Sequence, residues 1–338
     1  MKRNMKQWLL SLTGAKEKKA LPILSFPAVS LLGVTVKELI SDSDLQAKGM
    51  QAVAERVDAA AAVSLMDLSV EAECFGATVC VSDHEVPTIT GQLIHDEDEA
   101  RALEIPPVGS GRAPIYIDAI QKASERITDR PVLAGMIGPF SLAARLLDVT
   151  EIMVNCYDDP DTVHLVLEKA TAFLIEYAKA YRTAGADGIL LAEPVSGLLS
   201  PSLEQEFSAP YVKQIVDAVQ DDEFILIYHN CGGNTPLMVD SFLSFGAAAY
   251  HFGNAVDMKE MLEKFPMDVP LMGNVDPAGV LRNGSPASVR EATLALLEDC
   301  AQYPAFIPSS GCDVPPMTPW ENVDAFFEAT REYYEKHA

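Results

Sequence analysis

Short apolar runs alternate with helical stretches along almost the whole chain, and this alternation is the feature that most restricts its fold. Strands and helices that alternate in this way indicate parallel strands joined by helical crossovers. The runs are nearly continuous in apolarity, as strands buried on both faces require. We count eight of them, at residues 22–25, 61–65, 132–136, 188–192, 224–228, 248–252, 270–272 and 305–308. Eight such units predict an α/β fold, a closed (β/α)8 TIM barrel, and 338 residues suit a barrel with insertions.

The boundaries between these runs predict one domain over residues 1–338, with two additions to the barrel. The segment around Trp8 and Leu9 is too short for the apolar part of a signal peptide and is interpreted as an N-terminal helical extension. Residues 68–130, after the second predicted strand, are too many for one crossover. Alternation at residues 78–81 and 88–90 predicts a hairpin within this insertion, placed as a flap over the barrel mouth.

Composition excludes several classes of function. The net charge is −24, from 49 acidic and 25 basic residues, so the chain lacks the basic surface that a nucleic-acid partner requires. No stretch approaches the roughly 18 apolar residues of a membrane span. We therefore expect a cytoplasmic protein that binds neither nucleic acid nor membrane. In a reducing compartment its six cysteines stay thiols, free to be core residues or metal ligands.

Three residues with soft metal-binding side chains follow the ends of predicted strands. His229 and Cys231 follow the fifth run, and Cys312 follows the eighth. The functional groups of TIM barrels lie at the carboxyl ends of the strands, so loops from these two strands can converge. One imidazole and two thiolates fit Zn²⁺ with an open fourth position, which is typical of catalytic zinc. The alternative is that two cysteines, a residue type that is often buried, happen to lie near strand ends.

Three further strand-end residues are candidate catalytic groups, each with a structural alternative. Glu193 is interpreted as a fourth, displaceable zinc ligand or a general base, or else as a capping carboxylate. His251 is a candidate for contact with metal or substrate, or a histidine satisfied by neighbours at the barrel rim. Asp276 is a candidate for substrate binding, or the first residue of an Asx-type turn before a helix.

Several segments resemble the uroporphyrinogen decarboxylase superfamily over nearly the whole chain. They are Gly135-Met136-Ile137-Gly138-Pro139-Phe140-Ser141-Leu142, Leu199-Ser200-Pro201 with Pro210-Tyr211-Val212-Lys213, and Gly273-Asn274-Val275-Asp276-Pro277. Within the superfamily, His229-x-Cys231 and Ser310-Gly311-Cys312-Asp313 resemble the zinc motif of the corrinoid-dependent methyltransferases that methylate coenzyme M. The decarboxylases themselves resemble one another in an N-terminal Arg-Gln-Ala-Gly-Arg run that grips the porphyrinogen carboxylates. This chain has Leu24-Ser25-Phe26-Pro27-Ala28 there instead.

The resemblance implies transfer of a methyl group from methylcobalamin to a zinc-activated thiol, with the corrinoid as a co-substrate carried by a partner corrinoid protein. The acceptor would be a small molecule, either a thiol such as coenzyme M or a folate such as tetrahydrofolate. Arg112 and Lys213 are the basic candidates for pairing an anionic acceptor. Transfer in the reverse direction, a uroporphyrinogen-decarboxylase-like lyase, and a non-catalytic binding module remain as alternatives.

Overall fold

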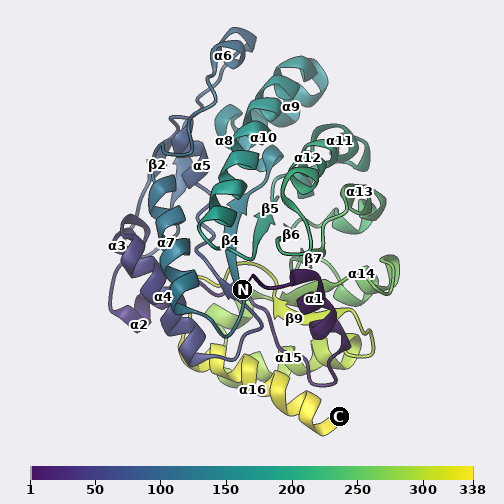
Figure 1. Cartoon of the computed structure of the whole chain (residues 1–338). Helices are drawn as coiled ribbons and strands as arrows, with labels where there is room; N and C mark the ends of the chain where they lie inside the picture. Colours follow the sequence, from purple (N-terminus) through teal and green to yellow (C-terminus); the bar gives the residue numbers. More distant parts are fainter. Residues whose placement is uncertain (1, 338) are drawn as a thin grey trace.

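The computed structural model describes residues 2–337, and its main sheet has seven parallel strands curled into a barrel (Figure 1). In order around the sheet they are β1 (Ala62–Val63), β4 (Val132–Ile137), β5 (Gly188–Ala192), β6 (Ile225–Asn230), β7 (Ala249–Phe252), β8 (Leu271–Val275) and β9 (Phe306–Ser310). Each strand coincides with one of the predicted runs, and all neighbours pair in parallel. The predicted α/β barrel class is confirmed.

An irregular segment takes the eighth place in the barrel. Residues 20–24 lie between β9 and the start of β1, since the Leu21 N–H donates to the Pro308 carbonyl at 2.9 Å and the Ala60 N–H donates to the Ala20 carbonyl at 2.8 Å. The prediction of a regular strand here is wrong. Pro22 has no N–H to donate, so a regular ladder cannot form on that side of the segment. The segment nevertheless joins the two edges of the sheet.

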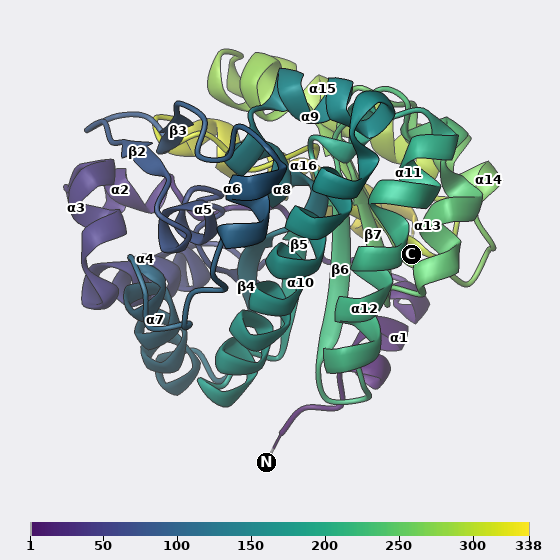
Figure 2. The same ribbon diagram turned by 90° about the horizontal axis from the view of Figure 1, so that it is seen from above.

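Helices surround the barrel on its outer face, as Figures 1 and 2 show. Those that follow the strands directly or return the chain to the next strand are α8 (Pro139–Leu147), α9 (Val149–Asp158), α10 (Pro160–Thr183), α11 (Pro201–Phe207), α12 (Ala209–Val219), α13 (Val239–Phe245), α14 (Met258–Lys264), α15 (Pro286–Cys300) and α16 (Trp320–His337). Three short helical turns lie in loops after β5, β6 and β8: η1 (Ser196–Leu198), η2 (Thr235–Leu237) and η3 (Pro277–Arg282). Among residues 2–337, no helix is both long and apolar enough to cross a lipid bilayer.

The N-terminal extension forms a helix, α1 (Met5–Gly14), that lies across the amino-terminal end of the barrel (Figure 1). Its buried side chains Met5, Leu9 and Leu12 belong to the same apolar cluster as the residues that fill the barrel interior. Asn4 caps the helix by accepting a hydrogen bond from the Gln7 N–H. The amino-terminal end of the barrel is therefore packed, and the opposite end remains for chemistry.

The remaining elements precede β4 and include the predicted hairpin. They are α2 (Ala28–Leu32), α3 (Val36–Ser41), α4 (Ser43–Arg56), α5 (Val70–Cys74), β2 (Thr78–Cys80), β3 (Thr88–Thr90), α6 (Glu97–Ala102) and α7 (Ala113–Arg126). Strands β2 and β3 pair antiparallel. The loop between them is joined to η3 by an Arg282–Glu85 ion pair of 3.0 Å, and to α3 by the Val36 N–H, which donates to the Asp83 carbonyl. The hairpin is thus attached to the end of the barrel where the strands terminate.

Alternation along β6 determines which side chains enter the barrel. Ile225 and Ile227 belong to the interior cluster, whereas Leu226 and Tyr228 belong to the core between sheet and helices. Successive side chains of a strand point to opposite faces. His229, two residues after Ile227, therefore points into the barrel at its carboxyl-terminal end.

Candidate metal centre

The structure brings His229, Cys231 and Cys312 together at the mouth of the barrel. Their ligand atoms all lie within 4.8 Å of one another, and Nε2 of His229 is 3.4 Å from Sγ of Cys312. His229 is buried, whereas both cysteines are partly exposed. The imidazole thus forms the floor of the group, and the two sulfur atoms border the opening.

These three donors fit a tetrahedral zinc ion. Bonds of about 2.3 Å to sulfur and about 2.0 Å to nitrogen place neighbouring donors about 3.5–3.8 Å apart, close to the 3.4 Å between His229 and Cys312. The pKa of the Cys231 thiol is lowered, first of all by its hydrogen bond with Cys312, while the pKa of Cys312 is raised by the same hydrogen bond and by burial. The remaining thiol protons would leave when a metal binds.

A chain of hydrogen bonds orients the His229 ring. The Leu21 carbonyl can only accept, so the Ser309 hydroxyl donates to it at 2.7 Å and accepts from Nε2 of His251 at 2.8 Å. His251 is buried and neutral, because burial and the neighbouring His229 hold its pKa well below the usual value. Its Nδ1 therefore accepts from Nδ1 of His229 at 2.8 Å. This network assigns the proton of His229 to Nδ1 and directs the lone pair of Nε2 towards the two sulfur atoms.

Glu193 lies outside this group and caps helix α8. Its carboxylate accepts the backbone N–H groups of Phe140 and Ser141 at 2.8 and 2.9 Å, and the Ser141 hydroxyl at 2.7 Å. Ala192 faces the barrel interior, so Glu193 faces the helices. A carboxylate at a helix N-terminus is also stabilised by the helix dipole. The arrangement favours the capping alternative, and it offers no support for Glu193 as a zinc ligand or base.

His251 and Asp276 also take structural positions. His251 contacts His229, not the two sulfur atoms, and acts through the hydrogen-bond chain. Asp276 accepts the N–H groups of Ala278 and Gly279, both at 2.9 Å, at the start of η3. These hydrogen bonds form the Asx-type turn that the sequence analysis gave as the alternative to substrate binding by Asp276.

Two glycines allow the loop after β6 to bring Cys231 into place. A Cβ on Gly232 would lie 2.4 Å from the Cα of Gly197 in η1, and a Cβ on Gly197 would lie 2.6 Å from the Cα of Gly232. Neither position has space for a side chain. The loop that carries Cys231 therefore packs backbone to backbone against the loop after β5.

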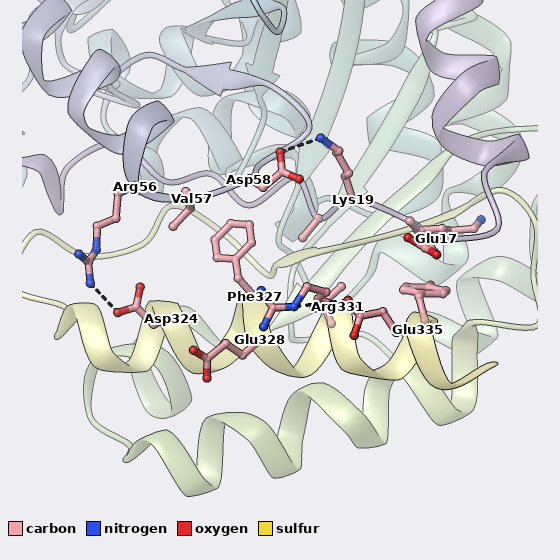
Figure 3. A pocket seen from close by; sticks show the side chains of 14 residues that line it. Glu17, Lys19, Arg56, Val57, Asp58, Asp324, Phe327, Glu328, Arg331 and Glu335 are labelled. Atoms are coloured by element: carbon pink, nitrogen blue, oxygen red, sulfur yellow. Dashed lines mark hydrogen bonds and ion pairs between the residues drawn. The ribbon is translucent and has the colours of Figure 1, made fainter. Parts of the chain in front are cut away.

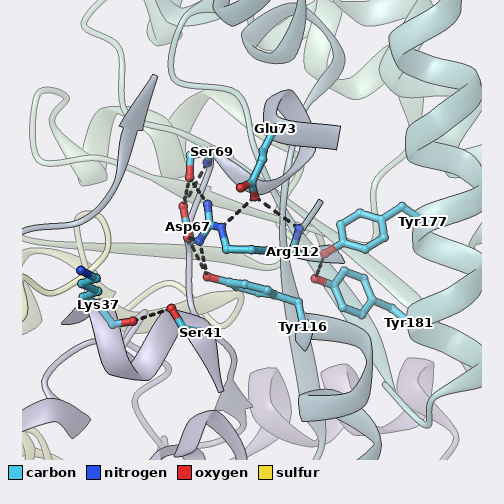
Figure 4. Close-up of polar contacts among 9 residues, drawn as sticks. All are labelled: Lys37, Ser41, Asp67, Ser69, Glu73, Arg112, Tyr116, Tyr177 and Tyr181. Atoms are coloured by element: carbon cyan, nitrogen blue, oxygen red, sulfur yellow. Dashed lines mark hydrogen bonds and ion pairs between the residues drawn. The ribbon is translucent and has the colours of Figure 1, made fainter. Parts of the chain in front are cut away.

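The two basic residues expected to meet an anionic acceptor are occupied elsewhere. Arg112 pairs with Asp67 at 2.6 Å and with Glu73 at 2.7 Å, and it donates to Ser69. Figure 4 shows this network, with Tyr116 donating to Asp67 at 2.6 Å. It fixes the insertion to the end of β1. Lys213 is exposed on α12 and pairs with Asp217 at 2.9 Å. The expectation for Arg112 and Lys213 is therefore not supported.

The cavities of the described residues lie at both ends of the barrel. One cavity, of about 450 Å³, lies between α4, α16 and residues 17–20 at the amino-terminal end, away from the thiols. Figure 3 shows that ion pairs such as Lys19–Asp58 and Arg56–Asp324 border it. A second cavity of about 310 Å³ opens at the mouth and includes Asp313, the residue after Cys312. Neither cavity is lined by the three candidate ligands, but the second reaches the residue next to Cys312 in the sequence.

Sequence reasoning missed the role of Ser309 and two charged residues near the mouth, Arg145 and Glu71. Arg145 lines the mouth cavity. Glu71 is buried in α5, where one carboxylate oxygen accepts the Ile137 N–H at 3.0 Å and the other has no partner. Arg145 is the one charged residue in Pro139–Leu147, an otherwise almost wholly apolar helix. A single arginine in an otherwise apolar helix could have indicated from the sequence that this position has a special role.

Fold and site together define an α/β barrel protein with an imidazole and two thiols at the carboxyl-terminal end of its strands. The family model of uroporphyrinogen decarboxylase (URO-D) matches residues 25–333. The chain belongs to this family.

Relatives in the family have two kinds of name. A methylcobamide:CoM methyltransferase, MtbA of Methanosarcina acetivorans, is 28% identical over 271 residues, covering 79% of this chain and 78% of that protein. A uroporphyrinogen decarboxylase of Coxiella burnetii is 28% identical over 284 residues, covering 81% and 77%. A solved methyltransferase structure from Methanosarcina mazei has a TM-score of 0.85 at 24% identity and covers 98% of this chain and 99% of that one. This structural match supports the fold alone. Because the methyltransferase and the decarboxylase relatives are equally identical in sequence to this chain, only the residues of the site can distinguish the two reactions.

Proposed function

We propose that this protein is a zinc-dependent methyltransferase that moves a methyl group between a corrinoid, carried by a partner protein, and a thiol such as coenzyme M. The single observation that carries the proposal is the convergence of His229, Cys231 and Cys312 within 4.8 Å at the barrel mouth. The name of the relative MtbA supports a methylcobamide donor and coenzyme M as acceptor. Tetrahydrofolate or another acceptor, and transfer in the reverse direction, use the same site.

Each residue of the centre has a defined task in this reaction. His229, Cys231 and Cys312 would hold Zn²⁺, which supplies Lewis acidity that keeps a bound thiol deprotonated at neutral pH. The partly exposed thiols leave the side towards the opening free for the acceptor. His251 and Ser309 hold the His229 ring, so the three donors are oriented before metal arrives. The barrel floor excludes water from below, because the interior beneath His229 is filled by apolar side chains.

Exposed apolar residues at the mouth suit the docking of a partner protein. Large apolar side chains are exposed on segments that follow the strand ends: Val154 and Tyr157 of α9, Leu198 of η1, Leu237 of η2 and Met317 after β9. Contiguous apolar patches at protein surfaces often mark sites where another protein binds. A corrinoid protein that covers this face would bring its methyl group to the metal centre.

A decarboxylase reaction is the second candidate, favoured by the equally similar Coxiella burnetii relative. It would need no zinc and no cysteine. It would also need cationic groups for several carboxylates, and residues 24–28 contain none.

The deciding experiment is metal analysis of wild type and Cys312→Ser, purified without added zinc. We expect about one zinc per chain in wild type and a large loss in the variant, since one of three protein ligands is gone. Transfer from methylcobalamin to coenzyme M would then follow zinc content across the two proteins.

Cys156→Ser is the matched control, because Cys156 is buried in α9 away from the trio. It should keep the zinc of wild type. A folded wild type that takes up no zinc would overturn the proposal. Release of CO₂ from porphyrinogen, unchanged in Cys312→Ser, would favour the lyase.

A further inference from the structure

Asn230 separates two of the candidate metal ligands in the sequence, and its side chain is completely buried. Successive side chains of a strand point to opposite faces, so His229 points into the barrel and Asn230 points outward, on the same face as Tyr228. A buried amide without partners would cost free energy, so such a side chain is normally hydrogen-bonded. The partners of Asn230 therefore indicate what this amide holds in place.

The amide oxygen of Asn230 forms a turn around Cys231. It accepts the backbone N–H of Gly232 at 2.9 Å, a hydrogen bond that reaches two residues along the chain and defines an Asx-type turn. The Thr235 hydroxyl donates to the Gly232 carbonyl and lies 3.4 Å from the same amide oxygen. Cys231 is the middle residue of this turn, so the turn determines the direction in which its side chain leaves the backbone.

The amide nitrogen of Asn230 attaches this turn to the loop after β5. It donates to the Ser196 hydroxyl at 3.0 Å and to the Tyr228 hydroxyl at 3.2 Å. The Ser196 hydroxyl itself donates to the Glu193 carbonyl at 3.1 Å, so it can only accept from Asn230. An aspartate could accept from Gly232, but it could donate to neither hydroxyl and would bury a negative charge. These contacts therefore require an amide at this position.

The turn is also packed backbone to backbone on two sides. A Cβ on Gly197 would lie 2.4 Å from the amide oxygen of Asn230, and a Cβ on Gly253 would lie 2.6 Å from the Cα of Cys231. The Gly253 N–H donates to the Asn230 carbonyl at 3.1 Å. Since main-chain atoms in such close contact cannot shift as the end of a long side chain can, the protein itself fixes the position of Cys231.

We propose that Asn230 is a positioning residue for the metal centre, whose amide orients the Cys231 thiol towards His229 and Cys312 before a metal ion binds. The three ligand atoms already lie within 4.8 Å of one another. A ligand that is held in place loses little conformational freedom on binding, so less of the binding free energy is offset by ordering the loop. This inference rests on the proposed function only in that the group binds a metal ion.

Binding of Co²⁺ to metal-free protein tests this role. Co²⁺ occupies tetrahedral sites suited to zinc, and its absorption spectrum reports thiolate coordination and tetrahedral geometry. In Asn230→Ala the Gly232 N–H loses its acceptor. We expect Co²⁺ affinity to fall about 10- to 100-fold, with a weaker thiolate-to-cobalt absorption band at saturation. Affinity and spectrum equal to those of wild type, in a folded variant, would overturn the inference.

Asn322→Ala is the matched control for a general loss of stability. Asn322 is also buried, and its amide nitrogen donates to the Leu281 and Gly284 carbonyls at 2.9 and 3.0 Å, between η3 and α16. The variant should lower the melting temperature as Asn230→Ala does, because each removes an amide that donates two hydrogen bonds. Its Co²⁺ affinity and spectrum should remain those of wild type. An equal loss of Co²⁺ affinity in both variants would reduce the effect to stability and overturn the inference.

Tyr228→Phe decides the question if Asn230→Ala does not fold. It removes one partner of the amide nitrogen and leaves the hydrogen bond between Asn230 and Gly232. We expect Co²⁺ affinity to fall about 2- to 10-fold, the contribution of one neutral hydrogen bond. Wild-type affinity in Tyr228→Phe would then overturn the inference.

Failure of this inference is distinguishable from failure of the proposed function. Zinc-loaded protein that methylates a thiol from methylcobalamin, with Asn230→Ala equal to wild type in metal affinity, would overturn the role of Asn230 alone. Metal binding that depends on Asn230, in a protein without methyl transfer, would keep the positioning role and remove the methyltransferase proposal.

Discussion

At the scale of residues, the candidate centre depends on a histidine that is not itself one of the candidate metal ligands. His251 accepts a hydrogen bond from Nδ1 of His229 and donates one to the Ser309 hydroxyl, which in turn donates to the Leu21 carbonyl. Partners of this kind fix the ring orientation of a metal-binding histidine and typically change metal affinity by about 10- to 100-fold. His251 is thus a positioning residue for His229.

Substitution of His251 tests that role. In His251→Leu, Nδ1 of His229 loses its acceptor, and we expect zinc affinity to fall by about 10- to 100-fold. His251→Gln should recover part of it, because a glutamine amide can both accept and donate. The measurement is competition with a chelator on folded protein, with circular dichroism as the check on folding. Equal affinities in the Leu and Gln variants would remove the hydrogen-bond explanation.

The sequence predicted the residues of the trio but not the tasks of their neighbours. His229, Cys231 and Cys312 were identifiable because each lies at or just after the carboxyl end of a strand. Glu193 also follows a strand, yet it points to the helices because the side chain before it, Ala192, fills the barrel. The alternation of side chains along the strand would have predicted this orientation of Glu193. The hydrogen-bond chain from His251 runs through Ser309 to the Leu21 carbonyl, which lies 288 residues before Ser309 in the sequence, and spacing alone cannot reveal such a contact.

At the scale of elements, α8 links the carboxyl end of β5 to the mouth cavity. Glu193 binds the first turn of α8, and Arg145 lies in its last turn. Gly138 makes this contact possible, because a Cβ there would lie 2.3 Å from the Glu193 carboxylate. The position of Arg145 in the cavity is therefore set by a carboxylate at the other end of the same helix.

Replacement of Glu193 separates capping from metal binding. Glu193→Ala leaves buried N–H groups of Phe140 and Ser141 without an acceptor, at about 1–3 kcal/mol each, so we expect a clear loss in the free energy of unfolding measured with urea. Zinc content should stay at the wild-type level. The exposed Glu176→Gln serves as control. Loss of zinc without loss of stability would restore Glu193 as a ligand.

The sequence predicted element types well and their ends less well. Helix α10, Pro160–Thr183, begins at Asp159-Pro160, a capping aspartate followed by proline at the first helical position. The first predicted strand did not form, because Pro22 interrupts its hydrogen bonding although the run is apolar. Apolarity predicts burial, and the segment is indeed buried. Whether a buried segment also forms the regular hydrogen bonds of a β-sheet depends on whether its residues have N–H groups to donate.

At the scale of the whole molecule, the negative charge and two buried glutamates act in the same direction with pH. Burial raises the pKa of Glu71 to about 7 and, with the nearby charge of Glu193, that of Glu204 to about 8. Each has one carboxylate oxygen without a partner. Between an unfolded pKa near 4.5 and these values the folded chain binds more protons than the unfolded chain, so stability falls as pH rises. A net charge of −24 adds repulsion.

We therefore expect the melting temperature of metal-free protein to fall between pH 6 and pH 8.5. A double variant, Glu71→Gln with Glu204→Gln, should reduce this dependence, since neither position then titrates, while Glu193, whose pKa burial also raises to about 7, retains part of it. Scanning calorimetry at fixed ionic strength measures both. A melting temperature that rises over the same interval in wild type would contradict the assigned protonation states.

The segment at residues 20–24 has a consequence for the order in which the site is made. It closes the barrel by bonding to β9, and through Leu21 it ends the hydrogen-bond chain from His229. These contacts join residues 288 positions apart in the sequence. Cys312 lies 83 residues after His229. The nascent chain therefore cannot present all three donors to a metal ion until Cys312 has been synthesised and β9 has paired with the segment at residues 20–24.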